Sequence, residues 1–379
     1  MKASVECPVL LLSTSDIHLG HPRVDTLDIT NKLRLCLFPR LKGADLLILG
    51  GDITDTAIGL GDAAAKLVIA FFIDLFRQAD EHGVIIVMLR GTLSHDRNHL
   101  ETLRILHERG GFKAPLYYAD KLGLGYIPEY DLRVAFLPDN LPYSKASDAL
   151  VVLHEQMQSK GWSTVDYAFV HGYFHHMLPA GLPREPQCTW RAEQFEFVNR
   201  YVLVGHVHRP LQEGKILNNG SFDRLAHGEE EDKGFLSICD DGTNAKITFI
   251  KNPYATPFIT FRLTEESAEA AILEFQKKLK GLDLTTTNHI RVLHPAPEVR
   301  QAIGQYIAKS GLPIRYSHKS PTKEVQTAAE TKKVVGAVAA LTPPNEKDLP
   351  ALISHYLSEH KRPLALDRIT HHLSRITPL

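Results

Sequence analysis

The sequence predicts an α/β fold built on a sheet that is covered on both faces, followed by a smaller α/β unit. Short apolar runs alternate with helical patterns as far as about residue 210. These runs are continuously apolar, which suits strands that are buried on both sides. Near residue 257 the pattern changes, and a second arrangement of strands and helices begins. We therefore expect one large domain and one small domain.

The first domain, residues 1–256, is expected to open with strands that end in polar loops. "VLLLSTSD" (9–16) is followed by "ADLLILGGD" (44–52), in which a Gly-Gly turn and a carboxylate follow the apolar run. Asp62 to His82 has helical periodicity, and Gly83 is suited to end that helix. Four further strands are expected at "VIIVMLRG" (84–91), "LRVAFLP" (132–138), "DYAFVHG" (166–172) and "YVLVGHVH" (201–208).

From about Lys215 the first domain is expected to close with short strands and turns. Asp241-Gly242 predicts a hairpin turn between the last two of these strands. The strands are expected at "KILNNGS" (215–221), "GFLSI" (234–238) and "KITFI" (246–250).

Residues 257–320 predict a small α/β domain. Thr264 is expected to cap a helix with one apolar face, formed by Ala268, Ala271, Ile272, Phe275 and Leu279. "HIRVLH" (289–294) and "PIRYSH" (313–318) are expected strands on either side of a helix at 297–311. Residues 321–346, rich in Lys, Thr, Ala and Pro, indicate a linker, and 347–379 a C-terminal helical segment that packs on this chain's core or on a partner.

The overall charge gives no global signal for nucleic-acid binding, because the net charge is −1. The charge is unevenly distributed, however. Residues 257–379 hold 17 Lys and Arg against 12 Asp and Glu, a balance of +5, which leaves −6 for residues 1–256. The positive balance has two interpretations: an ordinary solvated surface, or a mildly basic module that helps to hold a polyanion.

Cysteine usage and the N-terminus indicate a cytoplasmic protein without a membrane anchor. The four cysteines lack CxxC spacing, so they predict neither a zinc knuckle nor a disulfide framework. The N-terminal run "PVLLLSTSD" is too short for a membrane span and has no small-residue cleavage site.

Five polar motifs stand at the ends of expected strands, where an open sheet places its active site. They are Asp16-Ile17-His18, Gly51-Asp52, Ser94-His95-Asp96, His171-Gly172 and Gly205-His206-Val207-His208. A lone motif of this kind is more often a surface pair than a ligand set. Their combination after successive apolar strands predicts a metal site, and carboxylate and imidazole ligands suit Mn²⁺, Fe or Zn²⁺.

These motifs resemble those of the calcineurin-like metallophosphoesterases. "SDIHLG", "GGD", "HG" and "GHVH" carry the resemblance. The segment "NNGSFDRLAHGEEEDKGF" (218–235) is similar to the one that follows the last metal motif in SbcD-type nucleases, which act in DNA double-strand-break repair. The resemblance covers residues 10 to about 250. It implies a two-sheet metallophosphoesterase sandwich flanked by helices, with residues 257–320 as a capping domain.

The resemblance also implies two metal shells. Asp16, His18 and His208 would bind the first metal, Asp52 would bridge both, and His171 and His206 would bind the second. His95 would act as general acid or transition-state stabiliser, oriented by Asp96. The expected cofactors are two divalent metal ions, Mn²⁺ first, with Mg²⁺, Fe²⁺ or Zn²⁺ as alternatives.

The loop "RGTLSHD" (90–96) departs from the family, which has an Asn directly before the general-acid His. Ser94 occupies that position and is our expected substitute ligand of the second metal. Thr92, which directly follows Gly91, Asn98 and a water molecule are the alternatives. A hydroxyl is a neutral oxygen ligand with a shorter reach than an amide.

Several basic side chains near these motifs are candidates for substrate contact. His21, Arg90 and Arg97 could each reach a phosphate, although each could also be an ordinary surface residue, and Arg90 could pair with a carboxylate. In the family-like segment, Glu229 and Glu230 are expected to be structural partners of Arg224.

Together these features predict a two-metal DNA nuclease, a hydrolase acting in DNA repair and recombination. A metal-bridging water would attack the phosphodiester, as exonuclease or endonuclease, and His95 would assist. The resemblance further implies a homodimer and an SbcC-like, SMC-type ATPase partner. Two other functions stay open: a phosphodiesterase or phosphatase for non-DNA substrates, and a catalytically weak scaffold subunit of a DNA-processing complex.

Overall fold

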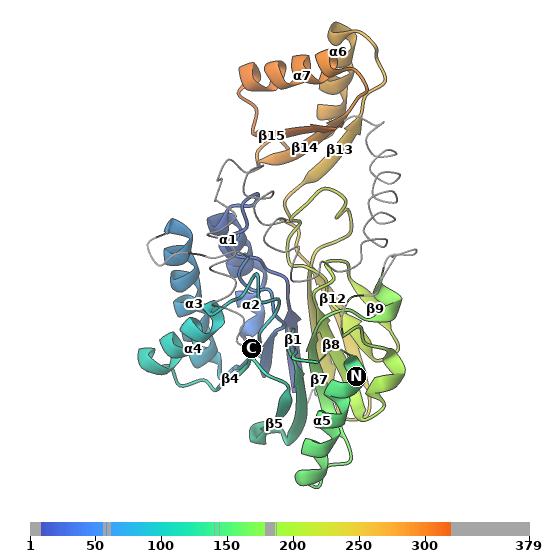
Figure 1. The fold of residues 1–379 in the computed structure, drawn as a ribbon. Helices are drawn as coiled ribbons and strands as arrows, with labels where there is room; N and C mark the ends of the chain where they lie inside the picture. Colours follow the sequence, from blue (N-terminus) through green and yellow to red (C-terminus); the bar gives the residue numbers. More distant parts are fainter. Residues whose placement is uncertain are drawn as a thin grey trace, which may run out of the picture. The chain divides into compact units, whose positions relative to one another are not determined.

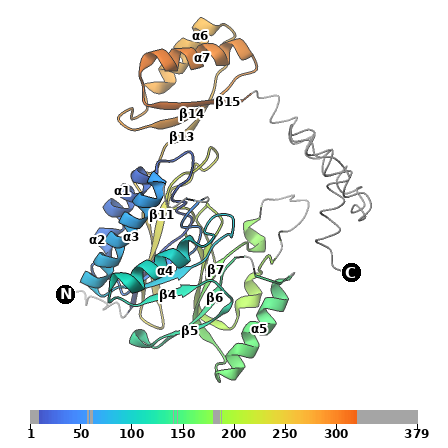
Figure 2. The same ribbon diagram turned by 60° about the vertical axis from the view of Figure 1, so that its left-hand side comes forward.

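A computed structural model describes residues 9–319 apart from 56, 57, 59–61, 140, 144, 179–185 and 187 (Figures 1 and 2). The chain divides into two compact units. Of the described residues, the first unit contains those in 9–261, 281–291 and 310–317, and the second those in 262–280, 292–309 and 318–319. The predicted linker at 321–346 and helical segment at 347–379 lie outside the described residues.

Two six-stranded sheets form the body of the first unit. One has the strand order β12-β11-β1-β2-β3-β4 and the other β5-β6-β7-β8-β10-β9. The strands are β1 (Val9–Thr14), β2 (Leu46–Leu49), β3 (Ile85–Leu89), β4 (Leu116–Ala119), β5 (Gly123–Ile127), β6 (Leu132–Leu137), β7 (Val165–His171), β8 (Val198–Gly205), β9 (Leu211–Glu213), β10 (Ile216–Asn218), β11 (Gly234–Asp240) and β12 (Ala245–Lys251). This confirms the α/β class with two large sheets.

Alternate residues of the strands explain why the apolar runs are continuous. Leu11 of β1 packs in the cluster between the two sheets, together with Phe169 of β7 and Leu203 of β8. The next residue, Leu12, belongs instead to the cluster that the helices cover, with Phe72 of α3. Because both faces of these central strands are buried, most of their positions are apolar, although β1 ends with the buried polar residues Ser13 and Thr14.

Helices cover the outer faces of both sheets. α1 (Thr26–Cys36), α2 (Phe38–Leu41), α3 (Ala63–His82) and α4 (His99–Gly110) lie on one side, and α5 (Ala146–Ser159) on the other (Figure 2). The predicted helix end is confirmed, because Gly83 caps α3 with a left-handed φ of 70°. Short 3₁₀ helices occur at Pro128–Tyr130, His175–Met177 and Ala192–Phe195.

The expected small α/β elements are present after residue 257. β13 (Phe258–Arg262), β14 (Asn288–Leu293) and β15 (Ile314–Lys319) form a three-stranded sheet, and α6 (Ala268–Leu279) and α7 (Pro297–Ser310) fall between its strands in sequence. The predicted cap Thr264 is wrong. Ser267 caps α6, since its hydroxyl accepts a hydrogen bond from the N–H of Ala270 at 3.2 Å.

The bonding of the cysteines and the hydropathy of the helices can be compared with the expectations from the sequence. Cys36 and Cys188 are free thiols, whereas Cys239 is disulfide-bonded, which the sequence did not predict. Within the described ranges, no helix combines the length and the apolar character needed to cross a membrane.

Candidate metal centre

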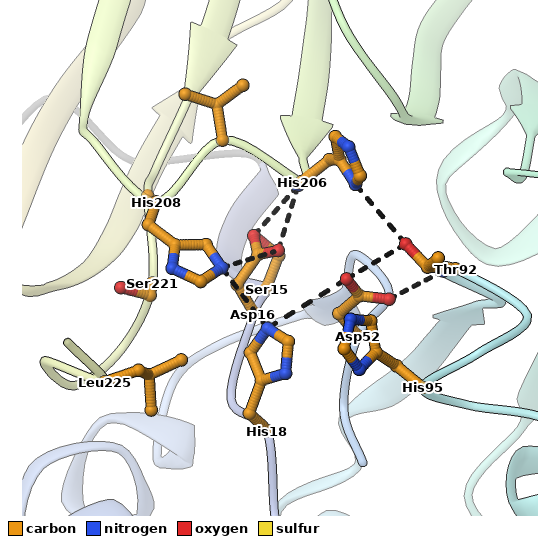
Figure 3. A network of polar contacts seen from close by, with 12 residues as sticks. Ser15, Asp16, His18, Asp52, Thr92, His95, His206, His208, Ser221 and Leu225 are labelled. Carbon is orange, nitrogen blue, oxygen red and sulfur yellow. Dashed lines mark hydrogen bonds and ion pairs between the residues drawn. The ribbon is translucent and has the colours of Figure 1, made fainter. Parts of the chain in front are cut away.

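Strand ends from both sheets meet at one edge of the sandwich and present the predicted motifs there (Figure 3). β1, β2 and β3 are parallel, as are β6, β7 and β8. The loops after these strands are tied together by backbone hydrogen bonds. The N–H of Asp16 donates to the carbonyl of Gly51 at 3.0 Å, and the N–H of Gly172 donates to that of Gly205 at 3.2 Å.

Four of the predicted ligand residues adopt a left-handed backbone conformation. φ is 51° at Asp16, 53° at His18, 50° at Asp52 and 102° at His206. Such conformations cost about 1–3 kcal/mol each for residues other than glycine, and they cluster at functional sites. The sharp turns direct these side chains inward.

The first group of potential ligands contains Asp16, His18 and His208, whose ligand atoms lie within 4.8 Å of one another. Nε2 of His18 lies 3.2 Å from Nε2 of His208, which itself lies 3.9 Å from Oδ1 of Asp16. The carboxylate of Asp16 is buried and accepts hydrogen bonds from the N–H of His206 at 3.0 Å. These are the residues predicted for the first metal.

The second group contains Asp52, His171 and His206, again within 4.8 Å. Oδ2 of Asp52 lies 3.3 Å from Nε2 of His171, and Nδ1 of His206 lies 3.2 Å from the same Nε2. Oδ2 of Asp52 also lies 3.9 Å from Nε2 of His18 in the first group. Asp52 therefore stands between the two groups, as a bridging ligand would.

In three of the four histidines, Nδ1 has an outer partner, which leaves Nε2 directed into the groups. Nδ1 of His18 lies 2.9 Å from Oδ1 of Asp55, Nδ1 of His208 lies 3.0 Å from Oε1 of Glu229, and Nδ1 of His171 lies 2.8 Å from the carbonyl of Gly50. Such outer acceptors fix the tautomer of a metal-binding histidine. The inward lone pairs then converge with two carboxylates, which is a donor set that could hold a metal ion.

Burial and the charges of Asp52 and His171 together determine the pKa values in the second group. Burial by itself would lower the pKa of His171, but the charge of Asp52 and their hydrogen bond raise that pKa to about 10. Burial would likewise raise the pKa of Asp52, and the charge of His171 lowers it instead. Burial, reinforced by the charge of His171, lowers the pKa of His206 to about 4. The carboxylates thus attract a positive charge into the site.

Asp96 does not orient His95, which corrects the sequence prediction. Its carboxylate is fully buried and is directed at backbone N–H groups of two loops. Oδ1 accepts from Ile53 at 2.9 Å and Thr54 at 3.0 Å, and Oδ2 accepts from Asp52 at 3.0 Å and Gly91 at 2.7 Å. The hydroxyl of Thr54 also donates to Oδ1 at 3.2 Å. Asp96 is therefore a clamp between the loop of Asp52 and the loop that begins at Gly91.

Asp55 takes the orienting role that Asp96 was expected to have. Nδ1 of His95 lies 2.7 Å from the backbone carbonyl of Asp55 and 3.5 Å from its Oδ1. The same carboxylate contacts His18, so one residue links the first group of ligands to His95. Asp55 follows Asp52 by three residues in "GDITD", and this second carboxylate was the signal that could have identified it.

The hydroxyl of Thr92 faces the second group of potential ligands, whereas Ser94, the residue expected from the sequence, is exposed. The hydroxyl of Thr92 donates to Oδ2 of Asp52 at 3.1 Å and lies 3.4 Å from Nδ1 of His206 (Figure 3). Ser94 is exposed at the tip of the loop, and Asn98 is exposed directly before α4. The preceding Gly91 is required, because a Cβ there would lie 2.2 Å from the backbone nitrogen of Asp52.

The candidate substrate-binding residues differ in their surroundings. The ring of His21 lies 6.3 Å from that of His18, at the rim of the first group. Arg97 is exposed two residues beyond His95. Arg90 pairs with Asp120, their charged atoms being 3.9 Å apart, so the carboxylate alternative holds for this arginine.

The segment 218–235 also contacts the candidate centre, through Glu229, in a way that the sequence did not reveal. Arg224 donates to the backbone carbonyls of Glu231 and Ala255, so the expected pairing of Arg224 with Glu229 is wrong. Glu229 instead contacts His208 and Lys233. Burial would raise the pKa of Glu229, but these two partners lower it to about 2.

A cavity of about 120 Å³ adjoins His171. Tyr173, Trp190, Asp139 and Cys188 contribute to its walls. The ring of Tyr173 also meets that of His206 edge-on, with centroids 4.2 Å apart, so this cavity borders the second group of ligands.

Comparison with known proteins gives no match to any family model and none to a curated protein. Among solved structures, the protein TT1561 of Thermus thermophilus is similar at 15% identity and a TM-score of 0.39, over 64% of this chain and 99% of that one. A second structure matches at 13% identity and a TM-score of 0.36, with the same coverage. Similarity of this degree assigns neither a family nor an activity.

Proposed function

We propose that this chain is a two-metal-dependent nuclease that hydrolyses phosphodiester bonds in DNA, of the calcineurin-like metallophosphoesterase type. One observation carries the proposal. Two groups of carboxylate and imidazole ligands are joined by Oδ2 of Asp52, which lies 3.3 Å from His171 and 3.9 Å from His18, and a further histidine, His95, stands beside them. A phosphoester hydrolase needs this combination of paired cation sites and an adjacent proton donor.

In this proposal, Asp16, His18 and His208 hold one cation, His171, His206 and Thr92 face the other, and Asp52 lies between them. Two bound divalent cations, Mn²⁺ first, would neutralise phosphate charge and lower the pKa of water between them. Two carboxylates balance only half of four positive charges. The occupied site would therefore attract a polyanion although residues 1–256 carry a net charge of −6.

His95 serves the leaving oxygen in the proposed reaction. Its Nδ1 is engaged by Asp55, so Nε2 is the atom that can meet a substrate. The side chain is about a third exposed, at 32%, and its ring lies edge-on to that of His18, with centroids 4.8 Å apart. When the P–O bond breaks, Nε2 gives its proton to the departing oxygen.

DNA as the substrate rests on the similarity of residues 218–235 to SbcD-type nucleases and on the positive balance of residues 257–379. The same resemblance supports a homodimer and an SbcC-like ATPase partner. The C-terminal segment that would meet this partner lies outside the described residues.

The test compares Mn²⁺-dependent degradation of linear duplex DNA with hydrolysis of bis-p-nitrophenyl phosphate. Wild type should cleave both, and His95→Ala should lower the turnover by roughly 10²–10⁴-fold, as expected for loss of a general acid. His154→Ala, which changes an exposed histidine of α5, is the matched control and should retain activity.

Two results would replace this proposal. Hydrolysis of the small ester with no action on DNA, with or without an ATPase partner, would favour a phosphodiesterase for other substrates. Absence of cleavage together with absence of bound metal would favour a scaffold subunit.

A further inference from the structure

Two charged residues of the segment 218–235 lie directly behind the metal-binding candidate His208, and the proposed reaction does not use them. Oε1 of Glu229 lies 3.0 Å from Nδ1 of His208. Nζ of Lys233 lies 2.9 Å from the other carboxylate oxygen of Glu229 and donates to the backbone carbonyl of His208 at 2.8 Å. Side chain and backbone of His208 are thus held by one ion pair.

Lys233 is unusual because its side chain is fully buried, at 0% exposure. A buried ammonium group is costly unless each of its three N–H groups finds an acceptor. Here all three do: Oε2 of Glu229, the carbonyl of His208, and the hydroxyl oxygen of Ser221 at 3.0 Å. With all three N–H groups engaged, Lys233 holds Glu229, Ser221 and the backbone of His208 in fixed positions.

The carboxylate of Glu229 is also held by several contacts. Its Oε2 accepts from the N–H of Leu225 at 3.2 Å as well as from Lys233. The N–H of Ser221 donates to the carbonyl of His208 at 3.1 Å, which anchors the same backbone group a second time (Figure 3 shows Ser221 beside His208). The segment therefore closes a ring through His208, Glu229, Lys233 and back to His208.

This ring determines which nitrogen of His208 is available. With Nδ1–H directed at Glu229, the lone pair of Nε2 points to His18, 3.2 Å away, and to Asp16. The second group has a different support, since Nδ1 of His171 contacts the carbonyl of Gly50. Substitutions in this ring should therefore affect the first group of potential ligands and leave the second group unchanged.

We propose that Glu229 and Lys233 are positioning residues that hold His208 in the orientation and tautomer needed to bind the first cation. The proposal rests on the proposed metal centre, because it concerns how one of its ligands is aligned. Loss of an outer partner of a metal ligand typically costs about 10–100-fold in metal affinity. The loss here should be confined to one of two sites.

The experiment measures Mn²⁺ binding to the purified full chain by isothermal titration and by electron paramagnetic resonance. Wild type should bind two ions, with a spin-coupled signal. Glu229→Ala should bind one ion as before and the other roughly 10–100-fold more weakly, with the signal of an isolated ion. Glu229→Gln keeps an oxygen that can accept from Nδ1–H, and should recover part of the loss.

Two further variants separate positioning from general damage. Glu230→Gln changes the exposed neighbour of Glu229 and should bind both ions like wild type. Lys233→Met removes the buried charge and should also weaken Mn²⁺ binding at the first site only. It leaves the carboxylate of Glu229 and the backbone carbonyl of His208 without their lysine partner. In each variant, unchanged binding at the second site shows that the chain has folded.

The outcomes distinguish this proposal from the one on which it rests. If wild type binds no Mn²⁺, the metal centre itself fails. If wild type binds two ions and Glu229→Ala binds both with unchanged affinity, the metal centre stands and the positioning role is overturned. Equal weakening at both sites in Glu229→Ala would also overturn it, because that pattern indicates only structural support.

Discussion

Asp96→Asn should destabilise the fold strongly, because the carboxylate clamps two loops of the site. Oδ1 accepts three hydrogen bonds, from the N–H groups of Ile53 and Thr54 and from the hydroxyl of Thr54, and Oδ2 accepts two, from the N–H groups of Asp52 and Gly91. An asparagine can place its single oxygen on one side only. Its NH₂ group would then face N–H donors on the other side.

The better orientation keeps the three bonds of Oδ1 and loses the two of Oδ2. A buried donor without an acceptor costs about 1–3 kcal/mol, so two such donors cost about 2–6 kcal/mol. We expect the free energy of unfolding of Asp96→Asn to fall by that amount. Burial and the charge of Asp52 raise the pKa of Asp96 to about 6, so the comparison belongs near pH 8, where the wild-type carboxylate is ionised.

The assay is urea unfolding of metal-free wild type, Asp96→Asn and the control Asp120→Asn, followed by circular dichroism. Asp120 is partly exposed and its pairing with Arg90 is loose, at 3.9 Å, so the control should lose less than about 1 kcal/mol. If Asp96→Asn unfolds like wild type but loses turnover, the clamp is refuted, and Asp96 acts on His95 as the sequence had suggested.

Three further predictions concern the ligand loop, Asp55 and a buried histidine. Thr92→Ala should weaken Mn²⁺ binding at the second site by roughly 10-fold, whereas Ser94→Ala should not; titration calorimetry decides, and the reverse order would contradict the placement of Thr92. Asp55→Asn should lower both Mn²⁺ affinity at the first site and turnover by roughly 10–100-fold, since Asp55 contacts His18 and His95; a loss in only one of them would separate the two roles. Burial, then the charge of Arg315, lowers the pKa of His289 to about 4, whereas the unfolded chain binds this proton near pH 6.5. Protonation therefore favours the unfolded chain, and the free energy of unfolding should fall as the pH drops from 6.5 towards 4. In His289→Gln, the free energy of unfolding should depend less on pH between 6.5 and 4. If the variant and wild type show the same dependence on pH, His289 is not its cause.

The strands and the ends of the long helix could be predicted because their signals are local. β2 and β3 are apolar on both faces, as is β1 as far as Leu12, and Gly83 ends α3 at the predicted residue. α1 escaped prediction because its buried face includes Thr26, Thr30 and Lys32, which interrupt the apolar period. Lys32 can be buried there because its ammonium group has three partners: Asp28 one turn earlier at 2.6 Å, and the distant Asp223 and Thr256 at 2.8 and 2.7 Å.

The motifs of the sequence suffice to name the candidate ligand residues that the structure brings together, whereas the outer partners of these residues could not be predicted. Asp16, Asp52 and His171 follow strands whose ends meet at one edge, so sequence order suffices to bring them together. Glu229 and Lys233 depend on how a loop folds back on His208, and Asp96 depends on N–H groups more than forty residues away. Contacts to backbone groups leave no pattern in side-chain identity.

The loop "RGTLSHD" shows how backbone contacts decide which side chain faces the candidate metal centre. Its two ends are fixed, because Asp96 accepts from the N–H of Gly91 at 2.7 Å and His95 is held by Asp55. Between them the chain turns, with the N–H groups of His95 and Asp96 donating to the carbonyl of Thr92 at 2.9 and 3.0 Å. Leu93 and Ser94 form the exposed tip of this loop. Counting back from His95 selects Ser94 as the ligand, but the clamp fixes the loop from Gly91, and this brings Thr92 to Asp52.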